Sequence, residues 1–293
     1  MNLFVFGLGY TAGHFVERER GGFARVAATA QALRAPAPEG VAMRIFSPGE
    51  ADPRIVEDLA RSDAILVSVP PQDGDPVLRA YADAIAASPA RWIGYLSTIG
   101  VYGDQGGAWI DEATPPAPTH ARTRERVAVE EAWLALGART AKAVQIFRLS
   151  GIYGPGRNAF VKLREGRAQR IVKAGQVFNR IHVDDIATAL AASLDRPRAG
   201  AIYNVTDDEP APPQDVTAFA AALAGLPLPP EVDFDTAALS PMARSFYGEN
   251  KRVRNRRLKE ELGVTLRFPT YREGLRGLME GAPAVHVRAG AEG

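Results

Sequence analysis

Short runs of apolar residues alternate with helix-like patterns through the first half of the chain. An apolar run of about four to eight residues is typical of a buried strand, whereas apolar residues three or four apart indicate one face of a helix. The expected strands are Asn2–Phe6, Arg25–Thr29, Met43–Phe46, Ala64–Val69, Trp92–Leu96 and Ala143–Leu149. The expected helices are Thr11–Glu19, Ile55–Arg61, Pro76–Ser88 and Arg122–Leu136. Such alternation predicts a parallel sheet covered by helices on both faces.

The pattern changes after Leu149, where a glycine-rich loop and a short helix from Asn158 are followed by a strand-like run at Ala201–Val205. We therefore expect an α/β fold, namely a Rossmann-type doubly wound parallel sheet with a smaller, interleaved C-terminal substrate lobe. The expected domains are a dinucleotide-binding Rossmann domain over 1–156, to which 181–206 returns, a substrate lobe over 157–180 and 207–281, and a mobile tail over 282–293.

Composition restricts the class of protein. In 293 residues, 46% are hydrophobic, which is enough for a sizeable core. Lys and Arg number 35 against 34 Asp and Glu, so the charge of +1 favours neither nucleic acid nor a membrane surface as partner. The basic residues at 251–259 are interpreted as a solvent face or a contact with the substrate lobe. We expect a cytoplasmic protein whose partners are small molecules.

Several other classes of site are disfavoured because the sequence lacks the residues that their chemistry needs. The sequence has no cysteine, which excludes disulfides, thiolate nucleophiles and cysteine-ligated metals. The four histidines are scattered without metal-ligand spacing, so no metal site is expected. No apolar run approaches the roughly 18 residues of a membrane span.

The stretch NLFVFGLGYTAGHF places Gly7, Gly9 and Ala12 in a GxGxx(G/A) pattern between an apolar strand and a helix. In this pattern Gly7 permits the tight turn, Gly9 lets the backbone approach a pyrophosphate, and Ala12 allows close helix–sheet packing. The free amides at the start of the helix, from Tyr10 and Thr11 onward, would receive the phosphates. The pattern predicts dinucleotide binding, and the alternative is a strand-to-helix turn that is merely tight.

The end of the second strand bears on the choice of coenzyme. A site that prefers NAD usually offers a carboxylate to the ribose hydroxyls about 20 residues further on. Here the sequence has Thr29 and Gln31, followed by Arg34, and nothing repels a 2′-phosphate. This favours NADP over NAD, although Gln31 and Arg34 are equally explained as solvated loop residues. Val69 and Pro70 are expected to line the bottom of the dinucleotide site. The alternative is that they simply end their strand.

Four further stretches follow in order: STIGVYG (97–103), RLSGIYGPGR (148–157), RIHVDDIA (180–187) and YNVTDDEP (203–210). In order and spacing the chain resembles the extended short-chain dehydrogenase/reductases, specifically the NAD(P)-dependent epimerase/dehydratase family, and it is most similar to an atypical branch of that superfamily. The resemblance covers nearly the whole chain. It implies a NAD(P)-binding oxidoreductase or epimerase that acts on a small-molecule substrate, and a homodimer by analogy.

The resemblance also implies where this chain departs from the family's catalytic residues. Thr98 matches the catalytic Ser/Thr, while Arg122 and Arg126 stand at the positions of the family's Tyr and Lys. A guanidinium stays protonated and offers only donors, so Arg122 can polarise a carbonyl or clamp an anion but cannot shuttle a proton. Tyr102 and Tyr153 are the candidate replacements, although tyrosines in such loops more often pack or anchor backbone.

Alternatives stay open for the helix and for the function. Arg122, Arg126 and Glu130 lie four residues apart, so i,i+4 ion pairs on a solvated helix would also explain them. Arg157 is a candidate ligand for an acidic group, and His182 is expected to be structural. The functional alternatives are a non-catalytic NAD(P)-binding sensor or scaffold, and a Rossmann-like domain that binds no dinucleotide. The sequence does not identify the substrate.

Overall fold

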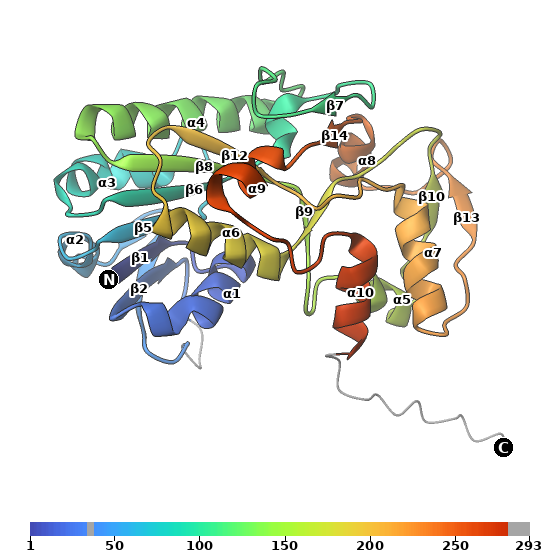
Figure 1. The fold of residues 1–293 in the computed structure, drawn as a ribbon, viewed down its shortest axis with the longest axis horizontal. Helices are drawn as coiled ribbons and strands as arrows, with labels where there is room; N and C mark the ends of the chain where they lie inside the picture. Colours follow the sequence, from blue (N-terminus) through green and yellow to red (C-terminus); the bar gives the residue numbers. More distant parts are fainter. Residues whose placement is uncertain (34–37, 281–293) are drawn as a thin grey trace.

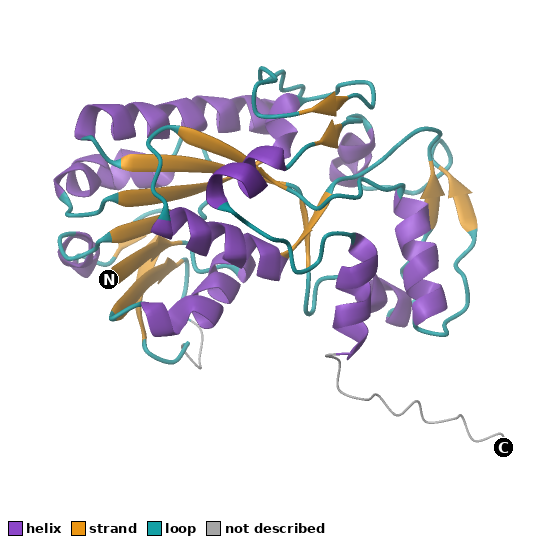
Figure 2. Ribbon diagram, in the orientation of Figure 1, coloured by secondary structure: helices purple, strands orange, loops and turns teal. Residues whose placement is uncertain are grey.

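In the computed structural model, which describes residues 1–33 and 38–280, a large sheet carries helices on both faces and a smaller lobe at one end (Figure 1, Figure 2). Within the described residues the sheet has eight strands in the order β12-β8-β6-β5-β1-β2-β3-β4. Neighbouring strands are parallel except β3 and β4. The strands are β1 (Asn2–Phe6), β2 (Arg25–Ala30), β3 (Val41–Ser47), β4 (Glu50–Ala51), β5 (Ala64–Val67), β6 (Trp92–Thr98), β8 (Ala143–Leu149) and β12 (Ala201–Val205). The expected α/β, doubly wound architecture is confirmed.

Side chains along β1 alternate between two cores. Leu3 and Val5 belong to the core of one face, and Phe4 and Phe6 to the core of the other. The first face is covered by α1 (Tyr10–Glu19), α6 (Val183–Asp195) and α9 (Arg256–Leu262), and the second by α2 (Arg54–Leu59), α3 (Pro76–Ala87) and α4 (Ala121–Thr140). Because both faces of the sheet are buried, the β1 residues that point to either face are apolar. The strand is therefore a continuous apolar run in the sequence.

The smaller lobe lies beyond the carboxyl ends of the sheet strands (Figure 1). It has its own core, which includes Phe160, Val216 and Tyr271. Its elements are β9 (Gly151–Tyr153), α5 (Ala159–Arg164), β10 (Arg170–Val172), β11 (Arg180–His182), α7 (Pro213–Leu223), β13 (Glu231–Asp233), α8 (Pro241–Tyr247), β14 (Arg252–Val253) and α10 (Tyr271–Glu280). Since β14 pairs with β7 (Trp109–Ile110), the late part of the chain is tied to a loop of the first half.

The observed element ends differ from the expected ones by a few residues, for local reasons. β6 continues to Thr98 because its last residue still pairs with Leu149 of β8. β5 stops at Val67, shortly before Pro70, which has no amide hydrogen to give to a ladder. The predicted tail at 282–293 lies outside the described residues.

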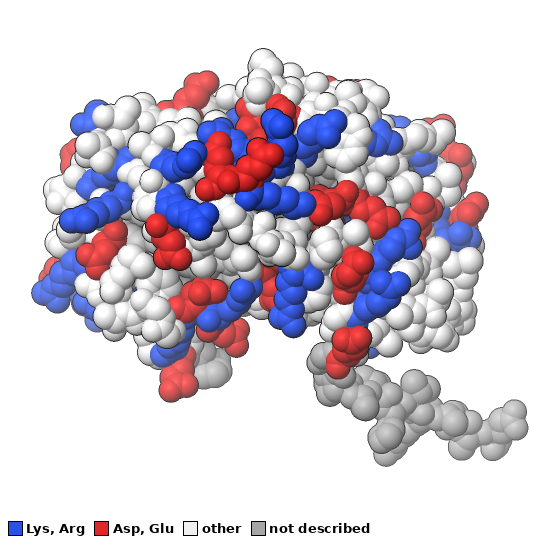
Figure 3. All heavy atoms as spheres, viewed as in Figure 1, with Lys and Arg blue, Asp and Glu red and all other residues white. Residues whose placement is uncertain are grey.

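Four of the six basic residues in the run at 251–259 have acidic partners among the described residues. Arg257 binds Glu261 with an N–O distance of 2.7 Å, and Lys259 binds Asp208 at 2.6 Å. On the face drawn in Figure 3, basic and acidic side chains are interspersed. The surface around this run therefore carries both basic and acidic side chains. In the described part of the chain, no helix has both the length and the apolar character needed to cross a membrane.

Candidate active site

The turn after β1 depends on glycine at its first position. Gly7 has φ +84°, and a Cβ added there would lie 2.9 Å from Cγ2 of Val69. The Gly7 amide donates to the Thr29 hydroxyl at 2.9 Å, and the Leu8 amide donates to the Thr29 carbonyl at 2.8 Å. Thr29 of β2 therefore holds the turn by hydrogen bonds, and Val69, which follows β5, leaves no room for a side chain at Gly7. The Thr29 hydroxyl serves the backbone here and is buried.

The space in front of α1 suits a diphosphate. Gly9 is the N-cap of α1 in an extended conformation, and a Cβ added there would meet no heavy atom within 4 Å. The first amides of a helix, here those from Tyr10 and Thr11, have no partner within the helix and carry its positive dipole end. Ala12 is fully buried against the sheet. Open space beside unpaired amides is the arrangement that binds phosphate groups at helix starts.

The remaining predicted coenzyme residues lie at the same edge of the sheet. Gln31 directly follows β2, Pro70 follows β5, and both are exposed. Since β2 and β5 flank β1, these two residues stand on either side of the Gly7 turn. Arg34 lies outside the described residues. Direct contact of these residues with a coenzyme stays a prediction.

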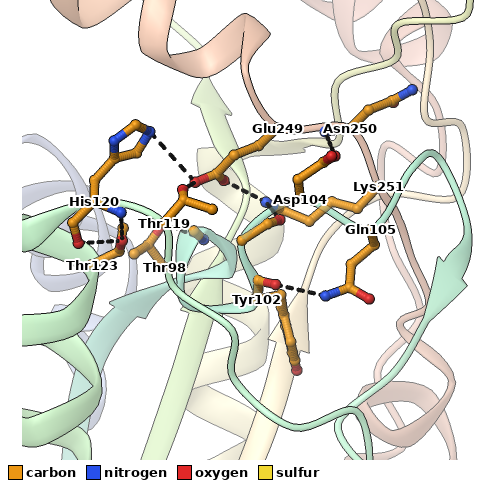
Figure 4. A network of polar contacts seen from close by, with 12 residues as sticks. Thr98, Tyr102, Asp104, Gln105, Thr119, His120, Thr123, Glu249, Asn250 and Lys251 are labelled. Atoms are coloured by element: carbon orange, nitrogen blue, oxygen red, sulfur yellow. Dashed lines mark hydrogen bonds and ion pairs between the residues drawn. The ribbon is translucent and has the colours of Figure 1, made fainter.

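Thr98 ends β6 and caps the short 3₁₀ helix η2 (Ile99–Tyr102). Its hydroxyl oxygen accepts a hydrogen bond from the Gly100 amide at 3.1 Å, which leaves its own hydrogen available for a ligand. A Cβ at Gly100 would lie 3.4 Å from Oγ1 of Thr98 and 3.2 Å from Cγ2 of Thr123. The first turn of α4 is therefore packed beside Thr98 (Figure 4).

Arg122 and Arg126, the two arginines that the resemblance aligns with the family's Tyr and Lys, have different surroundings. Arg126 turns back onto β6, where its Nη1 donates to the Tyr95 hydroxyl at 2.8 Å and to the Leu96 carbonyl at 3.1 Å. Arg122 is exposed, and its Cζ lies 4.8 Å from the ring centroid of Phe246 in α8. Arg126 therefore anchors α4 to the sheet, while Arg122 contacts the smaller lobe through Phe246 and is exposed to solvent.

The alternative of i,i+4 ion pairs along α4 is wrong for Glu130. The Glu130 side chain is buried and accepts hydrogen bonds from Arg148 of β8, with Nη2 at 2.7 Å and Nε at 3.2 Å. The Ser97 hydroxyl also donates to it. A buried carboxylate requires such a partner, since an unpaired buried charge is costly. Helix spacing alone does not reveal this strand partner.

The two tyrosines proposed as replacements are turned into the protein interior. Tyr102 is fully buried and donates to Oδ1 of Asn204 at 2.8 Å. Burial raises its pKa, against the opposing effect of Arg148. Tyr153 points toward the Thr270 carbonyl at 3.5 Å, and burial raises its pKa as well. Both phenols therefore stay protonated, with Tyr102 bonded to a side-chain amide and Tyr153 facing a backbone carbonyl.

His120 is the residue that the sequence reasoning missed. It is the N-cap of α4, two residues before Arg122, and its side chain is 38% exposed. Its Nε2, however, is buried without a hydrogen-bond partner and lies 3.9 Å from Oε1 of Glu249 (Figure 4). A carboxylate beside an imidazole is the arrangement that orients a general base. The only signal in the sequence was a histidine just before the helix that carries Arg122 and Arg126, because Glu249 comes from a distant segment.

Glu249 is held in place by several bonds. It accepts from the Thr119 hydroxyl at 2.7 Å and from the Lys251 ammonium at 2.6 Å. Lys251 also donates to the Gly103 carbonyl at 2.6 Å, and burial lowers its pKa while its bond to Glu249 opposes that change. The Asn250 amide donates to Asp104 at 2.7 Å. The segment 249–251 is therefore fixed to the loop that follows η2, and Glu249 is fixed beside His120.

His182 has a structural position. Its Nδ1 accepts from the Asp184 amide at 3.1 Å and so caps α6. The ring is buried between Tyr153 and Phe268, with centroid distances of 5.1 and 4.2 Å. A neutral imidazole suits this apolar environment, since burial disfavours the charged form.

Burial lowers the pKa of His182 from 6.5 to about 4, with Asp184 opposing and His14 and Arg267 adding to the shift. Between these two pH values the unfolded chain binds more protons than the folded one, so the free energy of unfolding falls as pH drops from 6.5 toward 4. We expect His182→Asn, which keeps a capping acceptor but cannot titrate, to show a shallower fall in urea unfolding over this range. Equal slopes in both proteins would contradict a buried neutral His182.

Comparison with known proteins agrees with this geometry. Residues 79–206 match the model of the NAD dependent epimerase/dehydratase family. A solved structure of a functionally unknown conserved protein from Silicibacter pomeroyi is 51% identical, with a TM-score of 0.85 over 96% of this chain and 99% of that chain. Protein YeeZ from Escherichia coli K12 is 28% identical over 157 residues, which are 51% of this chain. The match spans only 55% of YeeZ, little more than half of that protein's length.

A more distant solved structure shares the fold. MoeE5, solved in complex with UDP-glucuronic acid and NAD, is 21% identical, with a TM-score of 0.77 over 96% of this chain and 98% of that chain. The matched segment 79–206 includes Thr98, the start of α4 and Tyr153, and the fold likeness covers 96% of the chain. The resemblance expected from the sequence motifs is confirmed: residues 79–206 match the NAD dependent epimerase/dehydratase family model, and 96% of the chain shares the fold of MoeE5.

Proposed function

We propose that this protein is a NAD(P)-dependent oxidoreductase or epimerase in which Thr98 and His120 act where the family uses Ser/Thr and Tyr. The observation that carries the proposal is the His120–Glu249 pair at the start of α4, the same helix turn that packs beside Thr98. A guanidinium at position 122 cannot transfer a proton. The imidazole is the nearest side chain along α4 that can, because a ring nitrogen of histidine can both accept and donate a proton.

The residues divide the chemistry among them. The bound dinucleotide would supply the hydride acceptor or donor. Thr98 donates a hydrogen bond to the reacting oxygen of the substrate. In the oxidising direction the O–H bond of an alcohol breaks and its proton passes to the His120 imidazole, while the C–H electron pair leaves as hydride and a carbonyl forms. Glu249 then stabilises the imidazolium, and reduction runs through the same steps in reverse.

Arg122 supports an anionic substrate in this proposal. Its guanidinium is exposed between α4 and the α8 residue Phe246, and the structure gives it no carboxylate within ion-pair distance among the described residues. A forked donor of this kind binds carboxylate or phosphate groups well. A homodimer is proposed by analogy with the superfamily, and a cytoplasmic location is supported by the cysteine-free sequence.

We further propose NADP as the preferred coenzyme. Position 29 at the end of β2 is Thr29, whose hydroxyl is occupied by the Gly7 amide, and exposed Gln31 follows. No carboxylate stands at this strand end to bind ribose hydroxyls or to repel a 2′-phosphate.

Coenzyme titration followed by a substrate screen tests the proposed function. Purified protein is titrated with NADP(H) and NAD(H) while nicotinamide fluorescence and thermal stability are measured, since a ligand of the folded state raises its stability. We expect binding of both coenzymes, with NADP(H) tighter, and absorbance change with small carbonyl or alcohol substrates that carry an anionic group. Failure of both coenzymes to bind at millimolar concentration would refute the proposal. Binding without turnover across the screen would instead favour the non-catalytic sensor.

A further inference from the structure

The turn over residues 154–157 follows β9 and carries an exposed arginine. The Gly154 amide donates to the Arg157 carbonyl at 3.0 Å, and the Arg157 amide donates back to the Gly154 carbonyl at 3.1 Å. The turn is thus closed by two backbone hydrogen bonds. Since a short closed turn has few conformations, the backbone that bears Arg157 is well defined.

This turn is also fastened to the start of α1. The Tyr10 hydroxyl donates to the Pro155 carbonyl at 3.0 Å. A Cβ at Gly154 would lie 2.6 Å from that hydroxyl oxygen and 2.7 Å from Cγ1 of Val183, so only glycine permits this approach. Tyr10 is the first residue of α1, whose free amides lie beside the open space at Gly9. The position of Arg157 is therefore set relative to the predicted diphosphate site.

The guanidinium of Arg157 is held over Tyr10 and lacks an acidic partner. Its Cζ lies 5.7 Å from the Tyr10 ring centroid. Among the described residues no carboxylate lies within ion-pair distance of it, whereas Arg167 and Arg170 of the same lobe pair with Glu165 and Glu231. A cation held in place without a protein anion is poised for an anionic ligand.

We propose that Arg157 binds the diphosphate of the dinucleotide together with the α1 amides, with Tyr10 as a positioning residue that holds the guanidinium by stacking. This inference rests on the proposed coenzyme binding and assigns a further residue to it. The diphosphate carries two negative charges, of which helix amides neutralise only part, and a forked guanidinium supplies the rest. Because the diphosphate is common to both coenzymes, Arg157 contributes to affinity and not to the choice between NAD and NADP.

Calorimetric titration of Arg157→Gln at low ionic strength tests the proposal. The probes are NADPH, NADH, ADP-ribose, which has the diphosphate without nicotinamide, and AMP, which lacks the diphosphate. We expect Kd to rise about tenfold for the three diphosphate ligands and to stay unchanged for AMP, in line with a charge-assisted bond that is partly screened by solvent. The Kd of Arg157→Lys for these ligands should lie between the values of Arg157→Gln and the wild type, because lysine keeps the charge but loses the forked hydrogen-bond donors of the guanidinium. Arg164→Gln, an exposed arginine of the same lobe, is the matched control and should bind like the wild type.

The outcomes separate this inference from the proposed function. An unchanged Kd for ADP-ribose in Arg157→Gln, with wild type that binds, overturns the Arg157 assignment and leaves coenzyme binding intact. Weaker binding of AMP to the same degree, together with a lower Tm, assigns Arg157 a structural role and also overturns it. Wild-type protein that binds none of the diphosphate ligands refutes the proposed function itself.

Discussion

Replacement of Gly9 by valine is expected to abolish measurable binding of NADP(H) and NAD(H) while the protein stays folded. The backbone of Gly9 has φ −88° and ψ −166°, which a β-branched residue adopts readily, and a Cβ there meets no protein atom within 4 Å. The added isopropyl group would instead fill the open space in front of the α1 amides, where a diphosphate has to approach closely. We expect an affinity loss of about 100-fold or more, which corresponds to about 2.7 kcal/mol or more of binding free energy.

Gly13→Ala provides the matched control for this variant. A Cβ at Gly13 also meets no heavy atom within 4 Å, but the residue lies within α1 and not at its start. We expect normal coenzyme titration and a small gain in stability, because alanine favours helix by about 1 kcal/mol over glycine. Thermal unfolding of both variants reports the fold, and nicotinamide fluorescence reports binding. Unchanged affinity in Gly9→Val would show that the space in front of α1 is not the diphosphate site.

Substitution of His120 by asparagine is expected to lower kcat by about 10² to 10⁴-fold, with little change in coenzyme Kd. Asparagine is among the best N-cap residues, so the start of α4 should be retained. What is lost is the imidazole beside Glu249, which we propose as the group that exchanges a proton with the substrate oxygen. The measurement is steady-state turnover with the substrate found in the screen, together with coenzyme titration of the same preparation.

Two further variants distinguish proton transfer from a structural role of His120. Glu249→Gln keeps the shape of the side chain and its hydrogen bonding to Thr119 but removes the charge that stabilises an imidazolium, so a smaller fall in kcat is expected. In His120→Gly, added imidazole should restore part of the activity, which a structural role of the side chain does not predict. Full turnover in His120→Asn would return the search for the proton-transferring group to the remaining side chains near Thr98.

Much of the fold and of the coenzyme turn could be predicted because the relevant signals are local. Strand and helix periodicity is set by residues a few positions apart, which is why β1, β8 and β12 begin and end where expected. The Gly7 turn could be predicted equally well. A residue with positive φ that packs closely against a neighbour, here Val69, has to be glycine. The position of Thr98 followed from the family resemblance, since it depends on the end of a single strand.

The catalytic surroundings were harder to predict because they depend on contacts between distant segments. Helix spacing left open an i,i+4 ion pair between Arg126 and Glu130, yet Glu130 pairs with Arg148 on a strand. Tyr102 was a candidate proton donor until burial and its bond to Asn204 placed it in the interior. No sequence periodicity links such residues, so their contacts cannot be predicted from the sequence pattern.

By itself, therefore, the sequence determined the α/β architecture and the glycine turn, since these are properties of residue identity and short-range geometry. Only the tertiary structure decided which side chains meet: Glu249 beside His120, and Arg157 over Tyr10. It also decided which side chains lose contact with water. The physical reason is that charge pairing and desolvation depend on distance in space. Folding brings together groups whose separation along the chain does not reveal that distance.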